Sequence, residues 1–428
     1  MRIAFKTFGC KANSLDTDAL HLEALRRGHE IVAEKEPADA YVINSCTVTA
    51  AADRDARSQV LRYKRKNPLA LVGVVGCYAQ VAKEELLAIS QVDFVVGTAG
   101  KTSILDHFEA AARQESIARD QVQPSTGFLP VGFPGSRYAR AVIKVQDGCN
   151  FSCSFCIIPQ ARGRSRSLPE DTVLRQIEDA ATEGFREVVL TGIHLAHYGW
   201  DRGTDLMNLL RRVLAGAGPR VRVSTLDPFE IPDELVDWLG REPRLCPHLH
   251  IAIQSGSDRV LAGMRRVYKA AEFTEVTAKI ERRHPDTFVG VDVIVGFPGE
   301  TDEEFEATVR CLESSYWTKL HVFPFSARKN TRAWDLPHGV PPAAITERSA
   351  RLRELSTHRY QTFLSRQVGK ERDVLLERPS AKHAGLWLGH TENYVPTLSH
   401  ADTAGTREIV RSSVVEISGD RAITRTIP

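Results

Sequence analysis

The fold of this 428-residue chain is decided by one short segment, Gln146-Asp147-Gly148-Cys149-Asn150-Phe151-Ser152-Cys153-Ser154-Phe155-Cys156. Its cysteines form a Cys-x-x-x-Cys-x-x-Cys run. A [4Fe-4S] cluster takes four ligands, so three thiolates leave one iron open. An open iron can chelate a small molecule that carries an amine and a carboxylate, and the cluster is then a site of chemistry as well as an electron store.

Two simpler interpretations of this run are a structural zinc site and an incomplete ferredoxin. Zinc sites usually combine paired Cys-x-x-Cys groups, and ferredoxins have the spacing Cys-x-x-Cys-x-x-Cys, so the pattern favours neither. The spacing resembles the signature of radical S-adenosylmethionine (radical SAM) enzymes. This resemblance implies that Cys149, Cys153 and Cys156 are catalytic residues that hold the cluster to which SAM binds.

Length and composition are those of an ordinary soluble protein. The length predicts two to three domains, and 42% hydrophobic and 26% charged residues are typical of globular chains. No apolar run approaches the ~20 residues that cross a bilayer, and the N-terminus lacks the layout of a secretory signal. We therefore expect a cytoplasmic protein without a membrane partner. The net charge of +2 does not by itself indicate nucleic-acid binding.

Short apolar runs alternate with helical patterns through the first 120 residues. We expect strands at 3–5, 40–43, 70–75 and 93–96, and helices at 16–27, 50–66 and 83–89. This alternation predicts an open, mostly parallel α/β sheet, in which ligands bind beyond the carboxyl ends of the strands.

Cys10, Cys46 and Cys77 each follow one of the first three predicted strands. The topology would gather them at one edge of the sheet, where three thiolates again indicate a cluster with an open iron. The alternative is that they pack as small hydrophobic residues, but each lies beside Gly or a small polar residue, where side chains face a cleft. Cys246 and Cys311 have no cysteine neighbours, and we interpret both as packing residues.

The middle of the chain predicts an incomplete (β/α)6 barrel. Strands are expected at 141–145, 187–190, 220–224, 249–253, 288–295 and 319–325. Capping boxes at Ser167–Glu170 and Thr301–Glu304 are expected to begin two of the intervening helices.

Barrel enzymes place their chemistry on the loops that follow the strands. Small residues there let the backbone approach a ligand, and polar ones can hold an amine, a carboxylate or a ribose. The candidate cofactor-binding residues on these loops are Thr191, Gly192, Gln254, Ser255, Gly296 and Pro298. His194 and His197 lie nearby, but loop histidines are more often simply solvated.

From residue 367 the pattern changes to short alternating segments, which predict a small β barrel. This tail holds eight basic and eight acidic residues, so charge does not distinguish an RNA-binding module from a structural cap. Trp387 and Tyr394 are candidates for base stacking.

Nearly the whole chain resembles the methylthiotransferase family of radical SAM enzymes, and most closely the branch that modifies threonylcarbamoyladenosine in tRNA. The shared segments include Gly9-Cys10-Lys11, Asn44-Ser45-Cys46, Gly76-Cys77-Tyr78, the run from Cys149 to Cys156, Thr191-Gly192-Ile193-His194 and Glu392-Asn393-Tyr394. The resemblance implies three domains: an N-terminal methylthiotransferase domain at 1–120, a radical SAM core at 135–366 and a TRAM-like β barrel at 367–428.

The resemblance also implies the chemistry. Cys10, Cys46 and Cys77 would hold an auxiliary [4Fe-4S] cluster that receives sulfur, and the second [4Fe-4S] cluster would bind and cleave SAM. One SAM would methylate the sulfur, and a second would yield the radical that removes hydrogen from carbon 2 of the adenine. An aromatic C–H bond offers no acidic proton to a general base, which explains the need for a radical.

The implied partners are tRNA and an electron donor such as flavodoxin or ferredoxin; the sulfur donor is not indicated. Other substrates that the family resemblance leaves open are isopentenyladenosine in tRNA and an aspartate of a ribosomal protein, and a non-enzymatic alternative is an iron–sulfur RNA-binding or electron-transfer protein. The candidate phosphate contacts are Arg162, Arg164, Arg166, Arg265 and Arg266; the alternatives for Arg265 and Arg266 are that they serve the SAM site or cover the rim of the barrel.

One loop departs from the family pattern Ser-x-Arg-x-Gly-Thr. It is Ser326-Ala327-Arg328-Lys329-Asn330-Thr331 here, with Asn330 in place of Gly. Asn tolerates positive φ better than most residues, so we expect the turn to be kept.

Overall fold

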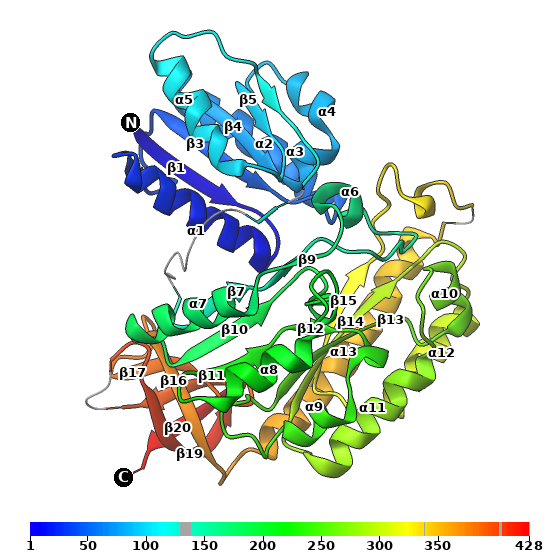
Figure 1. Cartoon of the computed structure of the whole chain (residues 1–428). Coiled ribbons are helices and arrows are strands. Elements are labelled where there is room, and N and C mark those ends of the chain that lie inside the picture. The colour runs from blue at the N-terminus through cyan, green and yellow to red at the C-terminus, as the bar shows by residue number, and fades with distance from the viewer. Residues whose placement is uncertain (126, 129–137, 338, 402–404, 428) are drawn as a thin grey trace.

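The computed structural model describes residues 1–125, 127–128, 138–337, 339–401 and 405–427. Figure 1 shows an N-terminal α/β unit, a central barrel-like unit and a small C-terminal barrel, drawn in orange and red at the lower left. The predicted fold class is confirmed in all three parts.

The N-terminal unit is a parallel six-stranded sheet in the order β2-β1-β3-β4-β5-β6. Its strands are β1 (Arg2–Thr7), β2 (Glu30–Val32), β3 (Ala40–Ser45), β4 (Leu71–Gly76), β5 (Phe94–Val96) and β6 (Asp120–Gln121). Its helices are α1 (Lys11–Arg26), α2 (Ala50–Lys66), α3 (Cys77–Val81), α4 (Lys83–Leu87), the 3₁₀ turn η1 (Lys101–Ser103) and α5 (Ile104–Ala112).

Both faces of this sheet are covered, so every residue of β3 is buried. Helices α1 and α5 pack on one face and α2, α3 and α4 on the other. The sequence prediction missed the short edge strands β2 and β6, which carry little apolar periodicity. It also began the first helix at 16, whereas α1 begins at Lys11, directly after Cys10.

The central unit contains two parallel sheets, β11-β10-β7 and β12-β13-β14-β15, joined where the chain runs from β11 into β12. Its strands are β7 (Ala141–Lys144), β10 (Glu187–Thr191), β11 (Arg220–Val223), β12 (Thr225–Leu226), β13 (His248–Gln254), β14 (Phe288–Val295), β15 (Lys319–Pro324) and the antiparallel pair β8 (Gln146–Asp147) and β9 (Arg166–Ser167). All six predicted strands are present, and together they form the predicted partial barrel.

Helices cover the outside of the partial barrel (Figure 1). They are α6 (Ile158–Arg162), α7 (Glu170–Thr182), α8 (Leu206–Ala215), α9 (Asp233–Trp238), α10 (Asp258–Gly263), α11 (Ala270–Arg283), α12 (Asp302–Glu313), α13 (Pro342–Ser365) and the 3₁₀ turns η2 (Leu195–His197), η3 (Pro228–Glu230) and η4 (Arg332–Trp334).

The two predicted capping boxes have different outcomes. The box at Thr301 is present, with the Thr301 and Glu304 side chains each bonded to the other residue's backbone N–H. The box at Ser167 is wrong: α7 follows Pro169, and Ser167 lies in β9, where its hydroxyl accepts the N–H of Gly199 at 2.8 Å. Ser167 pairs with Gln146 in the β8–β9 hairpin, so it is not available to cap the helix as the local sequence pattern predicts.

The C-terminal unit is a closed five-stranded barrel in the order β16-β17-β18-β20-β19. Its strands are β16 (Glu371–Pro379), β17 (Leu386–Thr391), β18 (Pro396–His400), β19 (Ile409–Ser418) and β20 (Arg421–Thr426). The end of α13 packs against it through Tyr360, Phe363 and Leu364. Within the described residues, no helix combines the length and apolarity needed to span a bilayer.

Candidate iron–sulfur sites and substrate cavity

The run of Cys149, Cys153 and Cys156 lies on the loop between β8 and α6, at the carboxyl end of the first barrel strand. The loop is fixed by Gln146, whose side-chain amide donates to the carbonyl of Gly148 at 2.7 Å. Gly148 has φ +75°, and a β-carbon there would clash with the carbonyl of Arg164. The turn therefore requires glycine.

The surroundings of these sulfurs fit thiolate ligands of a metal cluster. Burial raises the pKa of the Cys156 thiol to about 12, and burial also raises the pKa of Cys153. Hydrogen-bond donors act in the opposite direction and lower both pKa values. The backbone N–H of Ile158 faces Cys156, and the guanidinium of Arg266 donates to the sulfur of Cys153 at 3.1 Å. Donors that point at buried sulfur stabilise negative charge there, which a neutral packing cysteine does not need.

A cavity of about 300 Å³ lies directly beside the three cysteines. Two of the six predicted cofactor-binding residues line it, Gly192 and Gln254. Gln254 has φ +62°, at an irregularity in the register of β13 with β14. A residue other than glycine held in this strained region is typical of binding sites.

The other four predicted cofactor-binding residues are not among the residues that line this cavity. Thr191 is buried at the end of β10, and the Ser255 hydroxyl contacts Thr308. Gly296 donates its N–H to Glu300 at 2.8 Å, and Pro298 is half-buried. The hydrogen bonds of Ser255 and Gly296 therefore fix loop conformation at this end of the barrel.

The cavity also contains residues that the sequence interpretation missed. Asp227 forms an ion pair with Arg266, and both line the cavity with Phe151 and Asp292. Arg266 was a candidate for this site or for phosphate contact, and its contact with Cys153 places it at this site. No sequence pattern marks Asp227, because its partner lies on a different loop.

His194 and His197 differ although they are neighbours. Burial opposes the charge on His194, but hydrogen bonds with Cys149 and Glu230 raise its pKa to about 9. Burial and the charge of His194 lower the pKa of His197 to about 4. His194 therefore lies as a cation beside Cys149 and lines the cavity, whereas His197 is fully buried.

The second cysteine trio is gathered as the topology predicts. Cys10, Cys46 and Cys77 follow β1, β3 and β4 at one edge of the sheet, where Cys46 and Cys77 are buried and Cys10 is exposed. Burial raises the pKa of Cys46 to about 11, while backbone N–H groups of Val48 and Thr47 oppose the shift.

Gly9 provides a further indication of a crowded ligand site at this edge. It has φ +99°, and a β-carbon there would lie 2.6 Å from the sulfur of Cys46. Glycine at this position therefore leaves room for the Cys46 side chain.

A buried ionic network joins the two cysteine loops. Arg162 donates to Asn13 at 2.6 Å and to Asp147 at 3.1 Å, so it links the segment after Cys10 to the segment before Cys149. Asp16 pairs with Lys101 at 2.7 Å, with Lys144 at 2.6 Å and with Arg162 at 3.1 Å. Although burial would raise the pKa of Asp16, its cationic partners hold it well below its usual range.

This network corrects one expectation. Arg162 was a candidate phosphate contact, but only 1% of its surface is exposed, so it is not available to a nucleic acid at the surface. Its burial instead holds the two cysteine sites in a fixed relation, because each bond of the network would leave an unpaired buried charge if it were broken.

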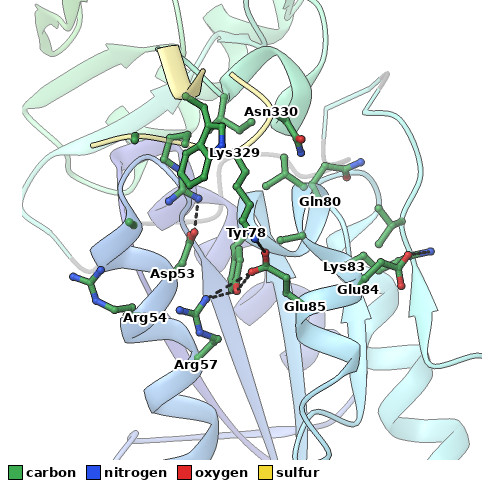
Figure 2. Close-up of a pocket in the computed structure, with 18 residues that line it drawn as sticks. Asp53, Arg54, Arg57, Tyr78, Gln80, Lys83, Glu84, Glu85, Lys329 and Asn330 are labelled. Atoms are coloured by element: carbon green, nitrogen blue, oxygen red, sulfur yellow. Dashed lines mark hydrogen bonds and ion pairs between the residues drawn. The ribbon is translucent and has the colours of Figure 1, made fainter. Parts of the chain in front are cut away.

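A cavity of about 650 Å³ lies where the N-terminal unit meets the loop after β15 (Figure 2). Arg328 from this loop forms an ion pair with Asp53 and donates to Thr47 at 2.6 Å, next to Cys46. Lys329 pairs with Glu85 at 3.0 Å. Asn330 has φ +65°, so the turn is kept without glycine, as expected.

Arg328→Ala is expected to lower the free energy of unfolding by about 3 kcal/mol, because it leaves the buried Asp53 carboxylate without its cationic partner. Lys329→Ala is the matched control: its ion pair is exposed, and we expect less than about 1 kcal/mol. Chemical denaturation of both variants at pH 7 measures the difference. Equal effects would contradict a specific role of Arg328 in holding the two units together.

Comparison with known proteins supports the interpretation of the barrel and its three cysteines as a radical SAM site. Residues 2–97 match the model of the uncharacterized protein family UPF0004, and residues 143–312 match the radical SAM superfamily. The chain is similar in structure to the radical SAM methyltransferase TsrM from Kitasatospora setae, with a TM-score of 0.57 and 16% identity over 75% of this chain and 72% of that one. The barrel and its cysteine loop thus define a radical SAM enzyme.

The most similar relatives among those compared belong to one family within the radical SAM enzymes. The chain is 38% identical to the threonylcarbamoyladenosine tRNA methylthiotransferase MtaB of Aquifex aeolicus, over 88% of this chain and 93% of that protein. It is 36% identical to the MtaB of Bacillus subtilis, over 92% and 89%. It is 32% identical to the tRNA-2-methylthio-N(6)-dimethylallyladenosine synthase of Opitutus terrae, over 98% and 97%. The chain belongs to the methylthiotransferase family of radical SAM enzymes, which use SAM and [4Fe-4S] clusters.

Proposed function

We propose that this enzyme adds a methylthio group to carbon 2 of N6-threonylcarbamoyladenosine next to the anticodon of tRNA. The observation that carries the proposal is the match, over about nine-tenths of the chain, to several relatives named for this activity. Relatives named for dimethylallyladenosine match at 31–34% identity, against 34–38% for those named for threonylcarbamoyladenosine.

In this proposal the three parts of the chain have separate tasks. Residues 1–120 hold the auxiliary cluster through Cys10, Cys46 and Cys77, and residues 135–366 hold the SAM cluster through Cys149, Cys153 and Cys156. Residues 367–428 form the TRAM-like barrel that contributes to tRNA binding. Two separate trios of sulfur ligands, with donors directed at the sulfurs, support this division.

When bound, SAM and its cluster supply the radical that takes hydrogen from an aromatic carbon, a step no side-chain base can perform. The chain's own residues position the reactants. Arg266 donates to Cys153 and holds Asp227 at the cavity, and Gly192 allows the backbone to approach the ligand. Electrons come from a donor such as flavodoxin or ferredoxin in this proposal.

Nucleoside analysis tests the substrate. We expect tRNA from a strain that lacks this protein to lose 2-methylthio-N6-threonylcarbamoyladenosine and to accumulate its precursor. The purified protein, reconstituted without oxygen with iron and sulfide, is expected to form that nucleoside in the precursor tRNA. Loss of the methylthio-isopentenyl nucleoside instead would assign the enzyme to the sister activity.

A further inference from the structure

A further cavity, of about 350 Å³, lies beside Cys10, where the N-terminal unit, the barrel strands and the C-terminal barrel meet. Leu15, Val142 and Val189 form apolar parts of its wall, and the aromatic ring of Tyr394 reaches it from the C-terminal barrel. The wall therefore offers surfaces for a planar base next to a proposed ligand of the auxiliary cluster.

Three cations line the same cavity: Lys11, Arg140 and Arg222. Asp18 is the one carboxylate among its described lining residues. The guanidinium groups of Arg222 and Arg140 lie over the ring of Tyr394, at 4.7 and 5.4 Å from its centre. Tyr394 itself has φ +67°, a strained backbone for a residue other than glycine, which is typical of a binding site.

The two arginines are only partly neutralised. Glu187 accepts from the Nε atoms of Arg140 at 2.7 Å and Arg222 at 2.9 Å, and Glu377 pairs with Arg140 at 2.8 Å. Nη2 of Arg140 and Nη1 of Arg222 are buried and have no hydrogen-bond partner in the described part of the chain. Arg222 is 2% exposed. A buried donor without an acceptor is costly, so these atoms favour a ligand that accepts hydrogen bonds.

Lys11 adds a third donor. Its ammonium has no hydrogen-bond or ion-pair partner among the residues that the structure describes. Lys11 is itself exposed, and it lines the cavity together with Arg140 and Arg222. An anion between these three groups would relieve their mutual repulsion.

We propose that Lys11, Arg140 and Arg222 form a carboxylate-binding subsite that recognises the threonylcarbamoyl group of the substrate adenosine. The inference rests on the proposed function, since that group carries a carboxylate and the isopentenyl group carries no charge. Guanidinium forks match a carboxylate in two parallel hydrogen bonds. An uncharged substituent would leave the buried donors unpaired, and sites built for a polar group reject analogues that lack it.

The test measures binding of short anticodon stem-loops to the full-length, cluster-loaded protein without SAM, so that no turnover occurs. The stem-loops carry threonylcarbamoyladenosine, isopentenyladenosine or unmodified adenosine at the same position. Wild-type protein is expected to prefer the first by about 10- to 100-fold, the range for a charged hydrogen bond. Lys11→Met should remove most of that preference without changing the affinity for the unmodified stem-loop, and Lys11→Arg should retain it.

Lys35→Met, which neutralises an exposed lysine of the same N-terminal unit, is the matched control and should leave the preference unchanged. Iron content of each variant confirms that the neighbouring cysteine site is loaded. Equal weakening of all three stem-loops by Lys11→Met would identify a backbone phosphate contact and overturn the subsite, and an unchanged preference would overturn it as well. A separate assay with SAM and a reductant tests the proposed function: wild-type protein that forms no methylthio product on the threonylcarbamoyl stem-loop there would overturn it, whatever the binding preference.

Discussion

Replacing Cys153 with Ala is expected to abolish SAM cleavage, by at least about 1000-fold in rate, equivalent to about 4 kcal/mol of activation free energy. The reason is that a cluster held by two cysteines at this loop would be lost or would lack its defined open iron. The N-terminal trio lies on a separate unit, so about half of the iron should remain. The measurements are 5′-deoxyadenosine formation from SAM under reducing conditions and iron content per chain.

Cys311→Ala is the matched control for this prediction. Cys311 is a partly buried cysteine on α12 whose sulfur lies 3.8 Å from the hydroxyl of Thr274, away from both trios. Its replacement should leave iron content and SAM cleavage unchanged. Retained cleavage in the Cys153 variant would refute the assignment of the cluster that binds SAM.

Cys46→Ala is expected to separate the two halves of the reaction. Cys46 is buried at the edge of the N-terminal sheet, and its loss should remove the auxiliary cluster while the barrel site stays loaded. SAM should then still be cleaved to 5′-deoxyadenosine, but without methylthio product. Product analysis by mass spectrometry, with iron content as the second readout, checks this, and full methylthiolation by the variant would show that Cys46 is not needed for sulfur transfer.

The order of strands and helices was predictable because it depends on local periodicity. The six barrel strands and the C-terminal barrel follow from alternation of apolar residues, which hardly depends on distant contacts. Two of the errors concern residues that bind a distant part of the chain. Ser167 pairs in a hairpin instead of capping α7, and Arg162 is buried in a network with Asp16 and Asp147 instead of reaching the surface.

The sequence also could not show which of the candidate cofactor-binding residues face the cavity. Gly192 and Gln254 line the cavity beside the cysteine run, but the Ser255 hydroxyl contacts Thr308 on α12, and Gly296 donates its N–H to Glu300 within its own loop. Both kinds of residue follow a barrel strand, so sequence position alone could not separate them. Which of them faces the cavity depends on how each loop packs against its neighbours.

The sequence by itself determined the class of chemistry and the topology, because three cysteines at fixed spacing and alternating strands and helices are local patterns. Only the tertiary structure decided how charge is distributed around the two cysteine sites. Arg266 lies at Cys153, and Lys11, Arg140 and Arg222 meet around one cavity although they are distant in the chain. Electrostatic interaction depends on distance in space and on burial, and neither can be read from spacing along a chain.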